Sequence, residues 1–224
     1  MQTQKSEQID LKAIKLIDDL PKSKIVNRKS KMNKIAVFAS GSGTNFQAFI
    51  DAVAHNILQA DIALLVSDNP DCMAVQRAEK HKIDIFTFNP KAYSSKTIFE
   101  QEIVNILRQK EVDLIVLAGY MRLVGDVLLS AFEGKIVNIH PSLLPAFPGL
   151  HAIEKAYYHG VKVFGITIHY VDNGIDTGAI LAQDCFRIDG NESLEEIENH
   201  IHQLEHKLYP KTVQELLNRQ EFTI

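Results

Sequence analysis

The sequence predicts an α/β protein built on an open, twisted β-sheet. Two runs, at residues 34–39 and 113–120, are almost continuously apolar, which is typical of parallel strands buried on both faces. Segments with helical spacing of apolar residues alternate with such runs, and this alternation predicts right-handed βαβ units. Residues 163–171 instead alternate apolar and polar side chains, as expected for an antiparallel strand with one polar face. We therefore expect a Rossmann-like sheet that is parallel in its N-terminal half, contains antiparallel strands in its C-terminal half and carries helices on both faces.

The first half of the chain contains a glycine loop between its first strand and its first helix. This loop, Ser40-Gly41-Ser42-Gly43-Thr44-Asn45, would offer backbone amides and the positive end of a helix to a phosphate. A tight strand-to-helix turn would use the same glycines for backbone freedom, so the loop alone leaves phosphate binding open. The expected strands of this half are 34–39, 62–66, 83–88 and 113–120, and the expected helices are 46–53, 72–82 and 96–109.

The second half begins with short elements and ends with a long helix. A strand at 136–140 is stopped by Pro141, which cannot donate to a sheet ladder. Ser193 and Glu196 form a capping box that begins the last helix, and Pro210 is expected to kink or break this helix after Tyr209. The expected elements of this half are strands 136–140, 163–171 and 179–185 and helices 127–131, 152–159 and 193–217.

Asn138 and His140 are the first candidate catalytic pair. Residues two apart on a strand point to the same side, and both lie where the strand leaves the sheet, at the edge where open α/β sheets bind ligands. An amide donor and a titratable imidazole aimed at one point can hold an oxyanion and move a proton. A polar strand end that caps a loop is the alternative interpretation of so short a motif.

A nicotinamide enzyme is a rival interpretation of the same glycine loop. Gly41 and Gly43 supply two of the glycines of a dinucleotide-binding motif, and Asp68 lies near the distance expected for a ribose-binding acid. The third glycine position holds Phe46, however, and a glycine there allows close packing of helix on strand. Phe46 therefore weakens this hypothesis.

Composition excludes several classes of protein. The 224 residues are 46% hydrophobic, yet no apolar run approaches the ~20 residues of a membrane helix, and the first residues lack a secretory signal. Cys72 and Cys185 lie far apart without metal-ligand spacing, which favours reduced thiols in a cytoplasmic protein. The formal net charge of −4 argues against non-specific binding of nucleic acid.

The leading residues differ in charge from the rest of the chain. Residues 1–31 carry eight Lys or Arg and four Asp or Glu, a net charge of +4, so residues 32–224 carry −8. Their apolar positions between Ile9 and Leu20 suit a short helix, but a single Arg and the Asp18–Asp19 pair argue against a mitochondrial presequence. We expect 1–31 to be a loosely attached or helical extension and 32–224 to be a single domain. Alternatively, Met32 is the true start.

Three segments of the chain carry a family resemblance: Ser40-Gly-Ser-Gly-Thr-Asn45, Asn138-Ile-His-Pro-Ser-Leu-Leu-Pro-Ala-Phe-Pro-Gly149 and Asp172-Asn-Gly-Ile-Asp-Thr-Gly178. With them, the chain from about Asn33 to Leu217 resembles the phosphoribosylglycinamide formyltransferase family. The resemblance implies formyl transfer from 10-formyltetrahydrofolate to the amine of glycinamide ribonucleotide in purine synthesis, without a metal. A monomer or weak homodimer is expected.

The resemblance also implies roles for particular residues. Asn138 and His140 would hold the tetrahedral oxyanion, and Asp176 would assist proton transfer. Residue 202 is His where Gln or Lys is expected from better-known members of the family, which leaves any specific contact from it open. Gly43, Thr44 and Asn45 match the phosphate loop and Glu205 matches the ribose contact. The folate site is matched by Met121, Arg122, Leu123, Val124, Val171, Asp172, Asn173, Gly174 and Ile175, and supporting positions by Thr167 and His169.

Relatives with the same catalytic pattern are less compatible with this chain. Formyltetrahydrofolate deformylase usually has a second His after the catalytic one, where Pro141 stands here, and an N-terminal domain for which 31 residues are too few. Methionyl-tRNA formyltransferase would need a further C-terminal domain and a basic surface, whereas residues 32–224 are acidic. A non-catalytic nucleotide-binding module would leave Asn138, His140 and Asp176 without a role.

Overall fold

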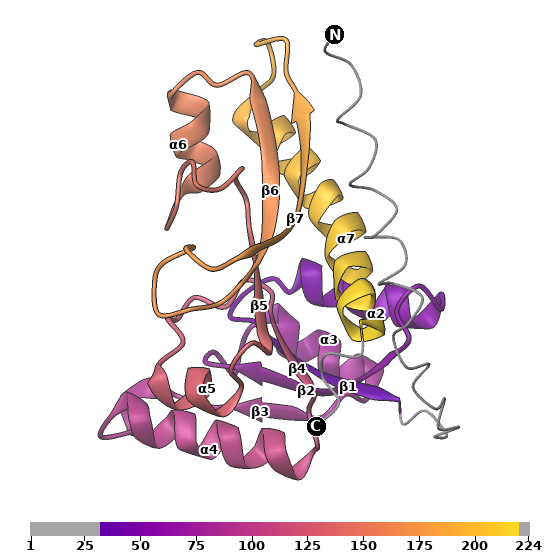
Figure 1. Ribbon diagram of the computed structural model, residues 1–224, viewed down its shortest axis with the longest axis vertical. Coiled ribbons are helices and arrows are strands. Elements are labelled where there is room, and N and C mark those ends of the chain that lie inside the picture. The colour runs from indigo at the N-terminus through magenta and orange to yellow at the C-terminus, as the bar shows by residue number, and fades with distance from the viewer. Residues whose placement is uncertain (1–31, 220–224) are drawn as a thin grey trace, which may run out of the picture. The chain divides into compact units, whose positions relative to one another are not determined.

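The computed structural model of the chain describes residues 32–219, so the predicted extension at 1–31 lies outside the described residues. These residues form a seven-stranded sheet in the order β3-β2-β1-β4-β5-β6-β7 (Figure 1). The first five strands in the chain are mutually parallel, and β6 and β7 run antiparallel to their neighbours. The predicted mixed sheet is confirmed.

The helices and strands follow the predicted order, with differences at their ends. The helix predicted at 96–109 has these bounds, whereas the strands predicted at 83–88 and 113–120 shorten to three and four residues. The strands are β1 Asn33–Phe38, β2 Ala60–Ser67, β3 Ile85–Thr87, β4 Leu114–Leu117, β5 Ile136–His140, β6 Val163–Tyr170 and β7 Ile180–Arg187. The helices are α2 Thr44–Ala54, α3 Met73–His81, η1 Pro90–Ala92 (a 3₁₀ turn), α4 Lys96–Gln109, α5 Asp126–Ala131, α6 Ala152–Tyr158 and α7 Leu194–Asn218.

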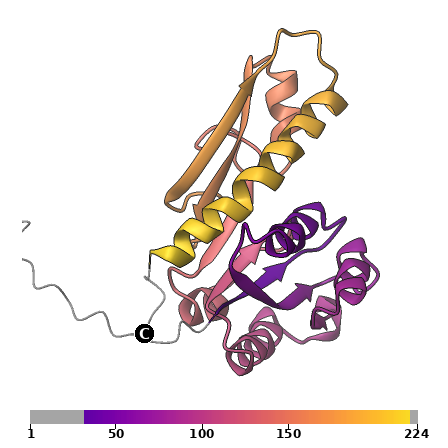
Figure 2. The same ribbon diagram turned by 90° about the vertical axis from the view of Figure 1, so that its right-hand side faces the viewer.

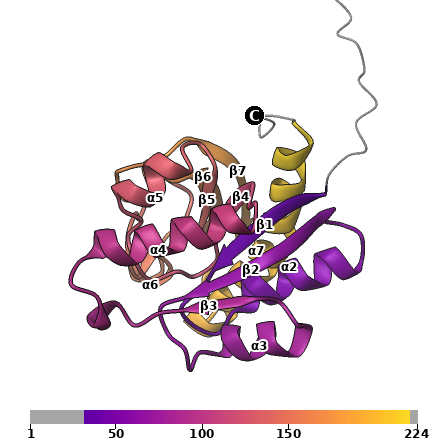
Figure 3. The same cartoon turned by 90° about the horizontal axis from the view of Figure 1, so that it is seen from below.

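Helices cover both faces of the sheet, as predicted. Successive side chains of β1 enter different cores: Ile35 and Val37 join the core under α2, α3 and α7, while Ala36 and Phe38 join the core under α4 and α5. Figure 3 shows α2 and α3 on one side of the parallel strands and α4 and α5 on the other. The parallel strands are therefore buried on both faces, which explains their nearly continuous apolar sequences.

The last helix contains Pro210 in its interior. α7 begins at the predicted capping box and continues through Pro210 to Asn218, so of the kink or break predicted after Tyr209 the break does not occur. An interior proline costs about 3 kcal/mol. The buried face of α7 offsets this cost, because each fully buried large side chain contributes about 1.5–3 kcal/mol. Tyr209, Val213 and Leu216 are buried on both sides of the proline's turn. α7 contacts both the β6–β7 hairpin and α2, as Figure 2 shows.

The sheet places the candidate catalytic residues at one edge. β1, β4 and β5 are parallel, so their carboxyl ends, and the loops that follow them, share this edge. β6 runs back along β5 with His169 opposite Asn138 and Thr167 opposite His140. Directly opposed residues in an antiparallel pair point to the same face, so these four side chains face the same way.

Within the described residues, none of the helices is long and apolar enough to cross a membrane.

Candidate active site

His169 determines how the amide of Asn138 is oriented. Nδ1 of His169 lies 2.8 Å from the carbonyl oxygen of Tyr170, which can only accept, so Nδ1 carries the hydrogen. Burial is the main cause that lowers the pKa of His169, which favours its neutral ring. Nε2 of that ring is then an acceptor, and it lies 3.3 Å from Nδ2 of Asn138. The amide therefore points its nitrogen toward His169 and keeps a second N–H to donate elsewhere.

Asp176 lies between the two histidines, although it is far from both in the sequence. Its Oδ2 is 3.2 Å from Nδ1 of His140, and its Oδ1 is 3.6 Å from Nε2 of His169. The backbone N–H of Gly149 donates to Oδ2 at 2.7 Å. The structure thus brings together Asn138, His140 and Asp176.

The ring of His140 is held from both sides. Nε2 lies 2.8 Å from the carbonyl oxygen of Phe147, and Nδ1 faces the Asp176 carboxylate. The Phe147 carbonyl can only accept, so Nε2 carries a hydrogen in this contact. His140 is 5% exposed, so its ring lies in a site largely shielded from water.

The glycine loop leaves the start of α2 open. Gly43 is the N-cap in the left-handed conformation (φ 66°), and no side chain caps the helix. A Cβ on Gly43 would lie 2.8 Å from Ala74, so the loop requires glycine here. The first amides of α2 have no acceptor within the helix, and they carry the positive end of its dipole. This arrangement can bind an anion.

The polar residues at the junction of α2 and α7 include most of the other predicted nucleotide contacts. Nδ2 of Asn45 donates to Oε2 of the buried Glu205 at 2.9 Å. Nδ1 of His202 lies 3.1 Å from the same oxygen, and this hydrogen bond is the main cause that raises the pKa of His202. Thr44 is the first residue of α2. The predicted phosphate loop and Glu205 are therefore adjacent in space.

The sequence of this chain matches a known protein family. The sequence model of the formyl transferase family matches residues 33–213. The chain belongs to this family. It is 55% identical over 186 residues to phosphoribosylglycinamide formyltransferase of Bacillus subtilis (strain 168), covering 83% of this chain and 95% of that protein. The resemblance predicted from the sequence is confirmed.

Two further matches extend this result. A crystal structure of glycinamide ribonucleotide transformylase 1 from Geobacillus kaustophilus is 54% identical, with a TM-score of 0.82, and covers 84% of this chain and 100% of that one. The trifunctional purine biosynthetic protein adenosine-3 of Drosophila melanogaster is 36% identical over 197 residues, which are 87% of this chain but 14% of that protein. The matches favour a formyltransferase over a nicotinamide enzyme or a non-catalytic nucleotide-binding module.

The loop after β4 contains the residues predicted to form the first part of the folate site. The N–H of Met121 donates to Oγ of Ser40 at 2.9 Å, which fixes the start of the loop. Arg122 lies 3.3 Å from Asp68 and over the ring of Phe99. Leu123 is exposed and Val124 packs partly on the core. Asp68, the acid of the rival nicotinamide hypothesis, therefore pairs with a cation of this loop.

The loop between β6 and β7 contains the residues predicted to form the second part of the folate site. Oδ1 of Asp172 accepts from the N–H of Gly174 at 3.0 Å and from Oγ1 of Thr177 at 2.7 Å. The Thr177 bond is the main cause that lowers the pKa of Asp172. Asn173 and Ile175 are exposed between these anchors, and the N–H of Val171 donates to the carbonyl oxygen of Ile136. These bonds order the loop that carries Asp176.

Sequence reasoning missed the groups that hold the candidate catalytic side chains. Phe147 and Gly149 act through backbone atoms, which no side-chain pattern reveals. Their loop is anchored by Thr167, whose Oγ1 donates to the carbonyl oxygen of Ser142 at 2.7 Å and accepts from the N–H of Leu144 at 3.0 Å. Nε2 of Gln183 on β7 also donates to Thr167, at 2.9 Å. Only the prolines at 145 and 148 signalled a stiff loop.

Members of this family use formyltetrahydrofolate as the formyl donor. Within residues 32–219, no group of three or more His, Cys, Asp or Glu side chains is placed to hold a metal ion. Both cysteines are free, Cys72 buried and Cys185 exposed.

Proposed function

We propose that this protein transfers the formyl group of 10-formyltetrahydrofolate to the amine of glycinamide ribonucleotide, in de novo purine synthesis. The observation that carries the proposal is the convergence of Asn138, His140 and Asp176 beside the open start of α2. Family membership supplies the reaction class, and this convergence supplies the groups that the reaction needs.

The nucleotide would bind at the junction of α2 and α7. Its phosphate would accept from the backbone amides of Gly43, Thr44 and Asn45, where the helix dipole favours an anion. The Glu205 carboxylate would accept from the ribose hydroxyls, since it already meets two donors there, on Asn45 and His202. This arrangement directs the amine of the substrate toward the end of β5.

The folate would bind between the loop after β4 and the loop after β6. Met121, Leu123 and Ile175 are exposed apolar side chains on these loops, and burying them against a flat ring would stabilise the complex. Arg122, Val124, Val171, Asp172, Asn173 and Gly174 complete the proposed contacts. The formyl group would then reach His140 and Asn138.

The chemical step joins these two sites. The amine attacks the formyl carbon, and the carbonyl oxygen becomes an oxyanion. The second N–H of Asn138 donates to this oxygen, and so does Nε2–H of His140 when the oxygen replaces the Phe147 carbonyl as its acceptor. The new C–N bond is complete in this oxyanion, which then collapses to re-form the carbonyl as the bond between the formyl carbon and N10 of the folate breaks. One proton leaves the amine and, by way of Asp176 or a water that it orients, reaches N10.

We also propose the domain organisation, the cellular location and the oligomeric state of this enzyme. The family match begins at residue 33, which supports residues 32–224 as a single formyltransferase domain with 1–31 as an extension. The cysteine content and the net charge of −4 support a cytoplasmic enzyme of small-molecule substrates, acting without nucleic acid or membrane. We expect a monomer or weak homodimer.

A direct assay tests the proposed reaction. Purified protein is mixed with 10-formyltetrahydrofolate, with and without glycinamide ribonucleotide, and the folate absorbance is followed. The proposal predicts turnover only when the nucleotide is present. Release of formate at the same rate without the nucleotide would instead identify a deformylase. No turnover in either mixture would also contradict the proposal.

A further inference from the structure

Arg77 on α3 holds the glycine loop from behind. Its Nε donates to the carbonyl oxygen of Ser42 at 3.0 Å, and its Nη1 donates to Oε1 of Gln47 at 3.0 Å. The N–H of Ala74, also on α3, donates to the carbonyl oxygen of Gly41 at 3.1 Å. One guanidinium therefore ties the loop to the first turn of α2.

The Ser42 contact controls which way the loop amides point. A trans peptide directs its C=O and its N–H to opposite sides. When Arg77 holds the oxygen of Ser42, the N–H of Gly43 points away from α3. If this peptide rotated, the negative end of its dipole would face a bound anion in place of the N–H. Gly43 packs against Ala74 so tightly that a Cβ would not fit. The rest of the loop therefore has little freedom to adjust if this peptide rotates.

The charge of Arg77 also acts at the start of α2. Arg77 lines a hollow of about 550 Å³ together with Thr44, Gln47 and His206. The pKa of His206 is lowered mainly by burial and, to a smaller extent, by charges that include Arg77. The nearby Glu205 carboxylate would repel a phosphate, and the positive charge of Arg77 behind the loop would offset part of this repulsion.

We propose that Arg77 is a positioning residue that gives this site its preference for a phosphate group, by orienting the Ser42–Gly43 peptide and supplying a fixed positive charge. It acts through the loop and does not touch the reacting atoms. The inference deepens the proposed nucleotide site and rests on it. Anion binding, however, can be measured without formyl transfer.

The first test uses orthophosphate as the probe. Its affinity is measured by the rise in the thermal unfolding midpoint and by inhibition of turnover. Arg77→Met is expected to weaken orthophosphate binding and to raise KM for the nucleotide by about 10–100-fold, the effect of losing a hydrogen bond to a charged group. The kcat should change by less than about threefold, because the reacting groups are unchanged. An unchanged affinity, or a fall in kcat with KM unchanged, would overturn the inference.

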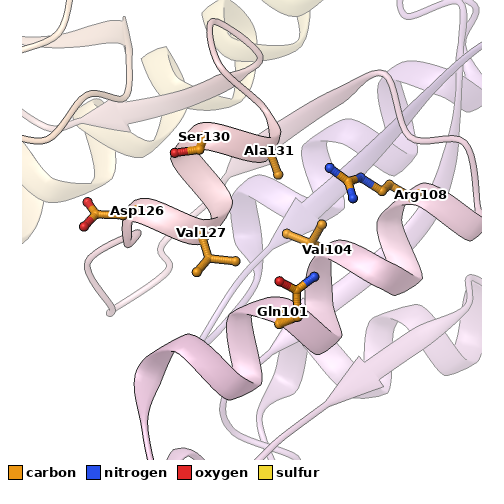
Figure 4. Close-up of a pocket in the computed structure, with 7 residues that line it drawn as sticks. All are labelled: Gln101, Val104, Arg108, Asp126, Val127, Ser130 and Ala131. Atoms are coloured by element: carbon orange, nitrogen blue, oxygen red, sulfur yellow. The ribbon is translucent and has the colours of Figure 1, made fainter.

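Two further variants separate the effect of the two guanidinium hydrogen bonds from the effect of the positive charge. Arg77→Lys keeps a positive charge but lacks the rigid fork that reaches both Ser42 and Gln47, so it should recover only part of the affinity. Full recovery would overturn the positioning role, and the same variant carries the test if Arg77→Met does not fold. Arg108→Met is the matched control, because Arg108 lines a separate hollow between α4 and α5 (Figure 4). It should leave orthophosphate binding and KM unchanged.

The outcomes also separate this inference from the proposed reaction. If formyl transfer is absent but Arg77→Met weakens orthophosphate binding as expected, the reaction is wrong and the role of Arg77 stands. If the reaction proceeds but Arg77→Met binds orthophosphate like the wild type, the role of Arg77 is wrong. A wild-type protein that binds no orthophosphate would also overturn it.

Discussion

His169 contributes to the site by staying neutral. Its Nδ1–H is committed to the Tyr170 carbonyl, and its Nε2 accepts from Asn138. Protonation of Nε2 would remove that acceptor and turn a donor toward the amide nitrogen. Burial lowers the pKa of His169 and opposes this protonation. In the proposed mechanism, His169 thus decides whether Asn138 can present an N–H to the substrate.

This lowered pKa predicts a pH dependence of stability. Below the ordinary histidine pKa of 6.5 the unfolded chain binds a proton that folded His169 does not, so stability should fall as pH falls through this range. We predict that His169→Gln loses less stability between about pH 6.5 and 5, by up to about 1.4 kcal/mol per pH unit. Urea unfolding at a series of pH values measures this. His202 and His206 are common to both proteins, so equal slopes would contradict the prediction.

At the scale of elements, the site depends on a loop held against two strands. The loop at 141–149 supplies the Phe147 carbonyl and the Gly149 N–H that hold His140 and Asp176. Thr167 on β6 and Gln183 on β7 anchor the loop through the Thr167 hydroxyl. The antiparallel hairpin therefore holds the loop that contacts His140 and Asp176.

Removing the anchoring hydroxyl should loosen the loop. Thr167 is fully buried, and Thr167→Val leaves the Ser142 carbonyl and the Leu144 N–H without their partner. We predict a loss of about 1–3 kcal/mol in the free energy of unfolding, together with a lower kcat. Thr212→Val on α7 is the control, since among residues 32–219 its hydroxyl donates only to the Leu208 carbonyl, and it should cost about 1 kcal/mol or less. Equal losses for the two variants, with kcat unchanged, would refute the anchoring role.

Element types were predictable where the apolar pattern was long, as for the helix at 96–109. The ends of strands were less predictable from the sequence, because β4 ends at Leu117 while the apolar run continues to Tyr120. Of the kink or break expected at Pro210, the break did not occur, because tertiary burial on both sides of the proline outweighs its local cost. The pairing of Asn138 with His140 followed from strand periodicity alone. The position of Asp176 came from family resemblance, since no local pattern links residues 36 apart.

On the scale of the whole molecule, charge and family match divide the chain near residue 32. Residues 1–31 carry a net charge of +4 and lie outside the family match. We predict that their deletion leaves kcat and KM nearly unchanged. The thermal midpoint should shift by less than about 2–4 °C, which corresponds to about 1 kcal/mol for a chain of this size. A larger drop would show that the extension contributes to the stability of the domain.

The central claim is that an amide, an imidazole and a carboxylate from β5 and the loop after β6 act together on the formyl group. The most direct measurement is the rate of formyl transfer by His140→Ala, beside its orthophosphate affinity. We predict that kcat falls by at least about 10²-fold, as when an oxyanion donor or an acid–base group is removed, while orthophosphate binds as in the wild type. A variant that turns over normally would contradict the account.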